Sequence, residues 1–181
     1  KVMFKDFNIN KFKNKKPPSN KSLGTFKEIK QLKNIKSDKK FVKDKDDIFS
    51  TFKSVADKNK IEYPAKLVKD LIDKSSKVIM ELKKHYKRPR PKTVAEEFDI
   101  KLNDIEMSSM KTPSYPSGHS AQGILISKVL ADKFPKAAKD FLKEGKNISY
   151  SRNVAKAHYK SDSKFGEELG NAMYQHIKNK V

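Results

Sequence analysis

The chain has 181 residues, a length that fits one domain and leaves too little sequence for two substantial ones. Its 42 Lys and Arg residues against 22 Asp and Glu give a formal net charge of +20, and no run approaches the roughly 18–20 apolar residues that span a bilayer, so we expect no transmembrane segment. The chain contains no cysteine, which excludes disulfides, cysteine-ligated zinc and thiol nucleophiles.

The first 21 residues are rich in lysine and have little regular pattern. The stretch 11–21, KFKNKKPPSNK, contains two prolines and no apolar periodicity, so we expect residues 1–21 to form a basic, extended arm that is flexible or draped over the surface. Residues 22–181 are expected to form the folded domain. An arm of this kind is also able to bind an acidic surface or to pack on a second copy of the chain, which leaves a homo-oligomer open.

Apolar residues recur at helical spacing through most of the domain, and no segment alternates in the manner of a strand. The helical pattern starts near Ser22 and resumes after Asp46 and Asp47, two acidic residues suited to a helix start. The clearest helix begins at Pro64 and ends before Pro89. The sequence therefore predicts an all-α chain.

The second half of the chain is expected to continue as helices over the following ranges: 93–103, 117–134, 136–144 and 149–178. Gly145 suits the C′ position at the end of the third of these helices. Residues 104–116, which contain two prolines, are expected to form a loop, and the last helix is expected to be interrupted.

Only three of the 42 basic residues are arginines, namely Arg88, Arg90 and Arg152. The lysines are scattered along the whole chain, which indicates a compositional bias more than a binding stripe. A basic nucleic-acid-binding protein is the non-enzyme alternative, although such proteins usually use Arg for bidentate phosphate and base contacts. Because lysine is tolerated elsewhere, the few arginines mark positions where a guanidinium is needed.

The first cluster that suggests chemistry is Lys83 and Arg90–Pro91, within KKHYKRPRP. A spacing of seven residues is two helical turns, so both cations could lean toward one side. An ordinary solvated basic helix end explains the same residues.

The second cluster is Pro116–Ser117–Gly118–His119, directly before an apolar helix. Ser117 suits the N-cap and Gly118 allows close backbone approach, so the helix N-terminus would present free N–H groups to an anion. His119 would then stand beside that anion as a proton donor. The alternative is an ordinary serine cap followed by an exposed histidine.

The third cluster is Ser151–Arg152, His158 and Asp162. His158 and Asp162 are four residues apart and share a helix face, so the carboxylate could fix the imidazole tautomer and leave the other nitrogen free as a nucleophile. An i, i+4 pair on a surface helix is the alternative. Arg152 and His158 lie about 240° apart on a straight helix, so the helix must break if both serve one site.

Together the clusters describe one site with three cations, helix N–H groups and two histidines. That set suits a multiply charged oxyanion and in-line phosphoryl transfer through a covalent phosphohistidine, without a metal ion.

All eleven positions of the three clusters resemble, in order and spacing, the motif of the type 2 phosphatidic acid phosphatase superfamily. That group includes soluble class A bacterial non-specific acid phosphatases, membrane lipid phosphatases and vanadium haloperoxidases. The resemblance covers residues 83–162 and implies a single-domain helical bundle.

The resemblance also implies the role of each site residue. Three cations would hold the phosphate oxygens, with further hydrogen bonds from the start of the helix: Lys83, Arg90 and Arg152, joined by Ser117 and Gly118. His158 would be the nucleophile and Asp162 its orienting partner. His119 would protonate the leaving alcohol and then help to activate water.

The resemblance to class A acid phosphatases implies a soluble, metal-independent phosphatase that acts on phosphomonoesters. No cofactor is expected, although phosphate or vanadate is expected to be able to occupy the site. The alternatives are a vanadate-dependent haloperoxidase and a lipid-phosphate phosphatase that acts at a membrane surface. The start of the chain lacks the apolar core of a signal peptide, so we expect a soluble protein, either cytoplasmic or exported with a signal that this chain does not contain.

Overall fold

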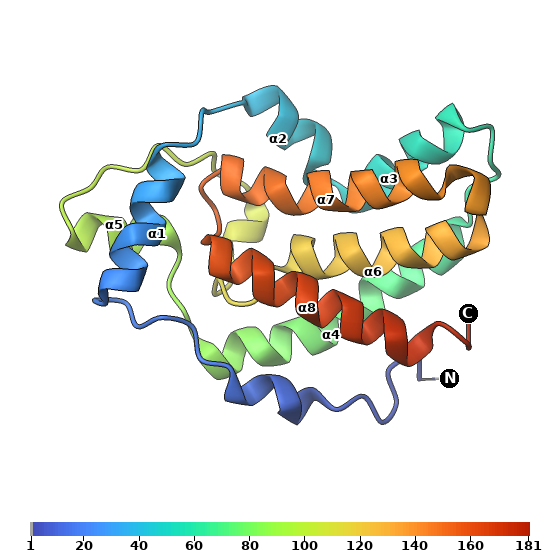
Figure 1. Cartoon of the computed structure of the whole chain (residues 1–181), viewed down its shortest axis with the longest axis horizontal. Helices are drawn as coiled ribbons and strands as arrows, with labels where there is room; N and C mark the ends of the chain where they lie inside the picture. Colours follow the sequence, from blue (N-terminus) through green and yellow to red (C-terminus); the bar gives the residue numbers. More distant parts are fainter. Residues whose placement is uncertain (1) are drawn as a thin grey trace.

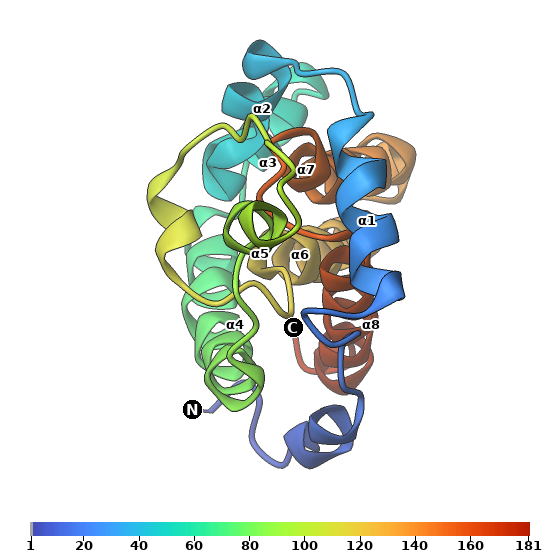
Figure 2. The same ribbon diagram turned by 90° about the vertical axis from the view of Figure 1, so that its left-hand side faces the viewer.

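The computed structural model describes residues 2–181, which fold into α-helices and short 3₁₀-helices without a strand, as predicted (Figure 1). The central helix is α6 (Gly118–Lys133). Figure 2 shows that α4 (Ala65–Tyr86), α7 (Ala138–Val154) and α8 (Lys160–Ile177) surround it. In this all-α bundle, α6 contacts every long neighbour and organises the core.

The sequence of α6, GHSAQGILISKVLADK, explains its central position. Apolar and small residues occupy all of its faces, and Leu125, Ile126 and Leu130 are fully buried. A helix without a polar face is stable only when other elements cover it on every side. Burial of each large aliphatic side chain stabilises the fold by about 1.5–3 kcal/mol.

The prediction that a helix ends at Gly145 is wrong, because α7 continues through this residue to its end nine residues later. A Cβ at Gly145 would lie 2.6 Å from the carbonyl oxygen of Gly123 on α6 and 2.5 Å from Ser127 Oγ. The absence of a side chain therefore serves the close packing of α7 on α6. The same residue type would also end a helix, which is why the sequence pattern was ambiguous.

The remaining elements are short and frame the bundle. They are α1 (Leu23–Lys33), α2 (Lys39–Asp46), α3 (Ile48–Lys58), α5 (Pro91–Glu97) and the 3₁₀-helices Ile9–Asn14, Ser108–Lys111 and Pro135–Ala137. The helix α2 was not predicted, because its mostly charged sequence KKFVKDKD buries only Val42.

Helix starts follow the sequence signals. Ser22 Oγ accepts a hydrogen bond from Thr25 N at the start of α1, and Asp47 accepts one from Ser50 N at the start of α3. Asp46, in contrast, is the last residue of α2 and does not start a helix. The interpretation of Asp46 as a helix start is therefore wrong, and Asp47 alone has that role.

Residues 2–21 lie along α4 and α8 (Figure 1). Phe12 is 4% exposed and packs beside Phe165 with ring centroids 5.9 Å apart. Tyr115 Oη donates a hydrogen bond to the carbonyl of Lys15 at 2.7 Å. The segment is thus draped over the bundle and contributes to its core, while the division of the chain at residue 21 stays a prediction.

Chain direction determines where the motifs meet. The helices α4 and α7 end, and α6 and α8 begin, at the left-hand end of the bundle in Figure 1, opposite the two termini. No helix within residues 2–181 is long and apolar enough to cross a membrane.

We expect Gly145→Ala to destabilise the fold by about 1–3 kcal/mol, because the new methyl group would clash with the α6 backbone. Gly24→Ala is the matched control, since a Cβ on this α1 residue would meet only ordinary contacts of 3.6 Å or more. The control should be neutral or slightly stabilising. Thermal unfolding followed by circular dichroism measures both changes, and equal melting temperatures for the two variants would contradict the account of this crossing.

Candidate active site

Four helix ends meet at the left-hand end of the bundle and carry the three motifs (Figures 1 and 2). A cavity of about 210 Å³ opens there, and six of the eight predicted site residues line it: Lys83, Arg90, Gly118, His119, Arg152 and His158. The other two, Ser117 and Asp162, are fully buried and bonded to this set. The structure therefore brings all eight residues together.

The start of α6 has the predicted cap. Ser117 Oγ accepts a hydrogen bond from Ser120 N at 3.2 Å, and Ser117 N donates one to the carbonyl of Asp162 at 3.1 Å. Gly118 lines the cavity without a side chain, which leaves the first turn of α6 open to an anion.

The predicted interruption lies at residues 155–159, between α7 and α8. Lys156 adopts a left-handed backbone conformation with φ of 58°, and Asn153 Nδ2 donates a hydrogen bond to the carbonyl of His158 at 3.0 Å. This break allows Arg152 and His158 to line the same cavity, which a continuous helix would prevent.

The contacts of His158 determine its tautomer. Arg90 Nη1 lies 2.9 Å from His158 Nε2, and a guanidinium only donates, so Nε2 accepts and the ring proton is on Nδ1. His158 Nδ1 then donates to Asp162 Oδ2 at 3.2 Å. Burial, followed by the charges of Arg90 and Lys83, holds the pKa of His158 well below its usual value. His158 is a neutral imidazole whose unprotonated Nε2 lies among the cations of the cavity and accepts a hydrogen bond from Arg90.

The carboxylate of Asp162 is fully buried behind His158. It accepts hydrogen bonds from Arg88 Nη1 at 2.8 Å and from Tyr159 N at 2.9 Å, in addition to the one from the imidazole. Burial raises the pKa of Asp162 to about 6, while the charge of Arg88 opposes this rise. The carboxylate can therefore hold the Nδ1 proton at neutral pH.

Lys83, Arg90 and Arg152 are the cations of the cavity. Burial lowers the pKa of Lys83 to about 7 and those of Arg90 and Arg152 to about 10, and repulsion from a neighbouring cation adds to the change at Lys83 and Arg90. Lys83 Nζ donates to the carbonyl of Pro113 at 2.7 Å, and Arg90 Nη2 donates to that of Ser109 at 2.8 Å. Crowded cations of this kind are suited to binding a multiply charged anion.

Arg152 is fully buried, and its Nε has no hydrogen-bond partner. Its Nη1 lies 3.3 Å from Asp46 Oδ1, while the carbonyl of Asp46 lies 2.6 Å from His119 Nε2. Burial and the charge of Arg152 lower the pKa of His119, and the contacts with Asp46 oppose them. A phosphate dianion in the cavity would add negative charge beside His119 and raise its pKa.

Sequence reasoning missed three charged residues around the site. Arg88 was given no role, although the scarcity of arginine was a signal that could have identified it. Asp46 faces the cavity residues from the end of α2, and Glu28 reaches the start of α8 from α1. No local pattern marks Asp46 or Glu28, because only the tertiary fold brings them to the site.

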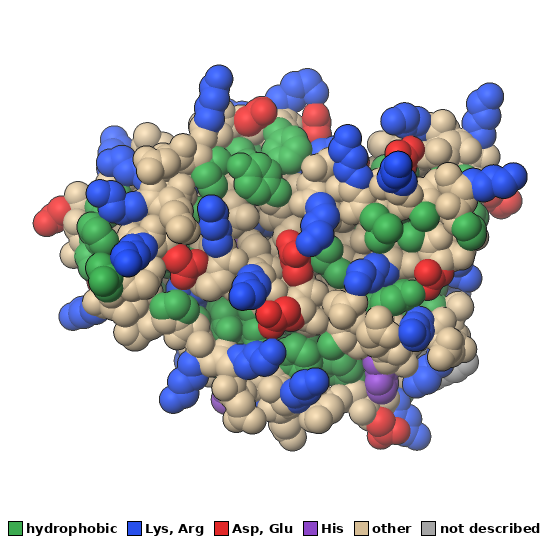
Figure 3. All heavy atoms as spheres, in the orientation of Figure 1, with side chains coloured by type: hydrophobic (Ala, Val, Ile, Leu, Met, Phe, Trp, Pro, Cys, Tyr) green, Lys and Arg blue, Asp and Glu red, His purple; other side chains and the backbone are tan. Residues whose placement is uncertain are grey.

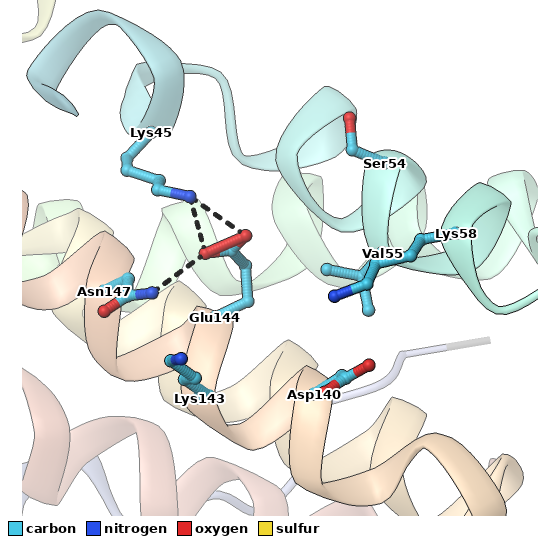
Figure 4. Close-up of a pocket in the computed structure, with 8 residues that line it drawn as sticks. All are labelled: Lys45, Ser54, Val55, Lys58, Asp140, Lys143, Glu144 and Asn147. Atoms are coloured by element: carbon cyan, nitrogen blue, oxygen red, sulfur yellow. Dashed lines mark hydrogen bonds and ion pairs between the residues drawn. The ribbon is translucent and has the colours of Figure 1, made fainter. Parts of the chain in front are cut away.

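A second hollow, of about 260 Å³, lies between α2, α3 and α7 (Figure 4). Its acidic groups are already paired, because Glu144 accepts from Lys45 at 2.8 Å and from Asn147, and Asp140 accepts from Asn59. In the part of the chain that the structure describes, no group of three or more His, Asp or Glu is arranged to hold a metal ion. Metal independence stays a prediction.

A family model described as the PAP2 superfamily matches residues 75–178, more than half of the chain. The chain belongs to the PAP2 superfamily. The matched range contains all eight predicted site residues, and the resemblance inferred from the motifs is confirmed.

Two curated relatives of this PAP2 chain are non-specific acid phosphatases. The protein from Salmonella typhimurium is 35% identical over 88 residues, and that from Salmonella typhi is 34% identical over 88 residues. Each match covers 49% of this chain and 35% of the relative, so the matched stretch is about a third of the relative's length.

We expect the imidazole of His158 to stay neutral when the pH of the phosphate-free protein is lowered through 6.5, because burial and the surrounding cations disfavour its charged form. Inorganic phosphate should raise its pKa by adding negative charge next to the ring. ¹⁵N NMR of histidine-labelled protein measures the pKa of His158 without and with phosphate. The signal of His158 is assigned as the one that is missing in His158→Gln. A normal titration that phosphate leaves unchanged would contradict the proposed surroundings of His158.

Proposed function

We propose that this protein is a metal-independent phosphatase that hydrolyses phosphomonoesters through a phosphohistidine intermediate. One observation supports this above all others: His158 directs a neutral Nε2 into a cavity lined by three cations, while Asp162 holds the proton on the opposite nitrogen. A nucleophile and an anion site then share one small volume.

In the first step, His158 Nε2 attacks the phosphorus of the bound ester. The N–P bond forms while the bond from phosphorus to the leaving oxygen breaks, and His119 gives that oxygen a proton as the alcohol departs. Lys83, Arg90 and Arg152 stabilise the charge on the equatorial oxygens, and the Asp162 carboxylate stabilises the imidazole as positive charge develops on it.

In the second step, water attacks the phosphorus from the side that the alcohol has left. His119, now neutral, takes a proton from the water, the N–P bond breaks, and inorganic phosphate forms. His158 returns to its neutral form with the proton still on Nδ1. The same cations serve both steps, since the charge on the transferred group is similar in each.

The chemistry of the relatives supports this proposal. Both are called non-specific acid phosphatases, and their similarity to this chain includes about half of it. The distribution of lysines on the surface does not favour the alternative of a nucleic-acid-binding protein. On the face in Figure 3 they are dispersed among acidic and apolar side chains and form no continuous basic patch.

We expect His158→Ala to lower kcat for an aryl phosphate by roughly 10³-fold or more in the presence of a chelator, because the nucleophile is lost. His85→Ala is the matched control, since His85 is exposed at the end of α4 and outside the cavity. Release of the aryl alcohol measures both rates. Equal activity of the two variants would exclude His158 as the nucleophile.

His119→Ala should slow the release of a poor leaving group more than that of a good one. An alkyl alcohol needs a proton as it departs, and loss of a general acid costs about 10²–10⁴-fold, whereas a nitrophenolate leaves without that help. The test compares kcat/KM of wild type and His119→Ala for an alkyl phosphate and for a nitrophenyl phosphate. An identical loss on both substrates would contradict the role of His119 as an acid.

A further inference from the structure

Arg88 lies behind the cavity and does not line it. Its side chain is 1% exposed, its Nη1 donates to Asp162 Oδ1 and to Ser161 Oγ at 2.8 Å each, and its guanidinium lies over the ring of Tyr159 at 3.8 Å. A buried guanidinium with these contacts holds the carboxylate that in turn holds the proton of His158.

Glu28 approaches the same place from α1, which lies outside the range matched by the family model. Its Oε1 accepts a hydrogen bond from Ser161 N at 2.7 Å, and its Oε2 accepts one from Ser161 Oγ at 2.8 Å. The same Oε2 lies 3.6 Å from Arg88 Nη2. Glu28 thus caps the first turn of α8 from another helix and balances part of the charge of Arg88.

A second contact fastens α1 to the segment that carries His158. Lys156 Nζ donates to the carbonyl of Leu32 in the last turn of α1, at 2.7 Å, and to that of Ile35 just after the helix, at 2.6 Å. Lys156 precedes His158 in the turn between α7 and α8, and Ser161, which binds Glu28, follows it in the first turn of α8. The helix α1 therefore holds the histidine-bearing turn on both sides.

We propose that Arg88 and Glu28 are positioning residues for His158, and that they act through the Asp162 carboxylate as a pair of opposite charges. Neither side chain lines the cavity. Arg88 favours the ionised carboxylate that accepts the Nδ1 proton, and Glu28 limits that effect by sharing the guanidinium. The effect of the Arg88–Glu28 pair on catalysis rests on the proposed function, whereas its effect on the protonation of His158 does not.

Several charges besides this pair face His158 and Asp162. They are Lys83 on α4, Arg90 in the segment after α4, His119 on α6 and Arg152 on α7. These groups stay in place in every variant below, so the comparison isolates Arg88 and Glu28. Removing the positive charge of Arg88 must make the His158–Asp162 pair bind a proton more tightly, and removing the negative charge of Glu28 must do the opposite.

The experiment measures the apparent pKa of His158 by ¹⁵N NMR in the full chain. Arg88→Met should raise it by about 1–3 units, the range expected for one charge at this distance. Glu28→Gln should lower it by a smaller amount, because Glu28 lies farther from the pair. Arg88→Lys keeps the charge and should bring the value back toward that of wild type.

Matched controls remove one charge of the same sign from exposed positions, as Lys84→Met and Glu62→Gln. These should shift the pKa of His158 by much less than the buried variants. Shifts of Arg88→Met and Glu28→Gln in the same direction, or no larger than those of the controls, would overturn the proposal. If Arg88→Met does not fold, Glu28→Gln still tests the proposal, because it should lower the pKa of His158 relative to wild type by more than Glu62→Gln does.

The second readout is the pH dependence of kcat for an aryl phosphate. The acid limb, where the His158–Asp162 pair takes up a proton, should move to higher pH in Arg88→Met and to lower pH in Glu28→Gln. A merely structural role would lower kcat at every pH without moving the limb. If the wild type hydrolyses no phosphomonoester, the proposed function fails, while the NMR titration still decides the roles of Arg88 and Glu28.

Discussion

The buried residue Asp162 joins all three motif segments through its carboxylate and its main-chain carbonyl. Its two oxygens bind Arg88 from the segment after α4, and His158 and Tyr159 from the turn before α8. Its main-chain carbonyl accepts the N–H of Ser117, which fixes the start of α6. One residue thus determines the positions of His158 and of the start of α6, so the geometry of the cavity depends on it.

The buried charges of this arrangement lower the free energy of unfolding, because they have lost their contact with water. Breaking a buried pair such as Arg88–Asp162 by removing one partner typically costs about 3–5 kcal/mol, since the other charge is left without compensation. Within residues 2–181, Lys83 and Arg90 form no ion pair with a carboxylate, and Arg152 is paired only with the partly exposed Asp46. Burial is the main cause of the lowered pKa values of these three cations. The fold accepts these costs because α6 is packed tightly between its neighbours, and a bound phosphate would relieve the repulsion.

The sequence predicted those features that local chemistry determines. The cap at Ser117, the long helix after Pro64 and the break between Arg152 and His158 each follow from turn signals or helical geometry, and the structure has them. Gly145 was misread because a glycine that ends a helix and one that permits close packing look alike in a single sequence. Arg88 and Glu28 could not be paired in advance, because they lie on separate segments that only the tertiary fold brings together.

The most direct test of the account is to trap the transferred phosphate during turnover. The protein is mixed with an excess of aryl phosphate, quenched in alkali, where phosphohistidine survives, and digested for mass spectrometry. The account predicts a phosphate on His158 that forms before free phosphate appears and decays when the substrate is exhausted. A phosphate on another residue, or full turnover with none on His158, would contradict it.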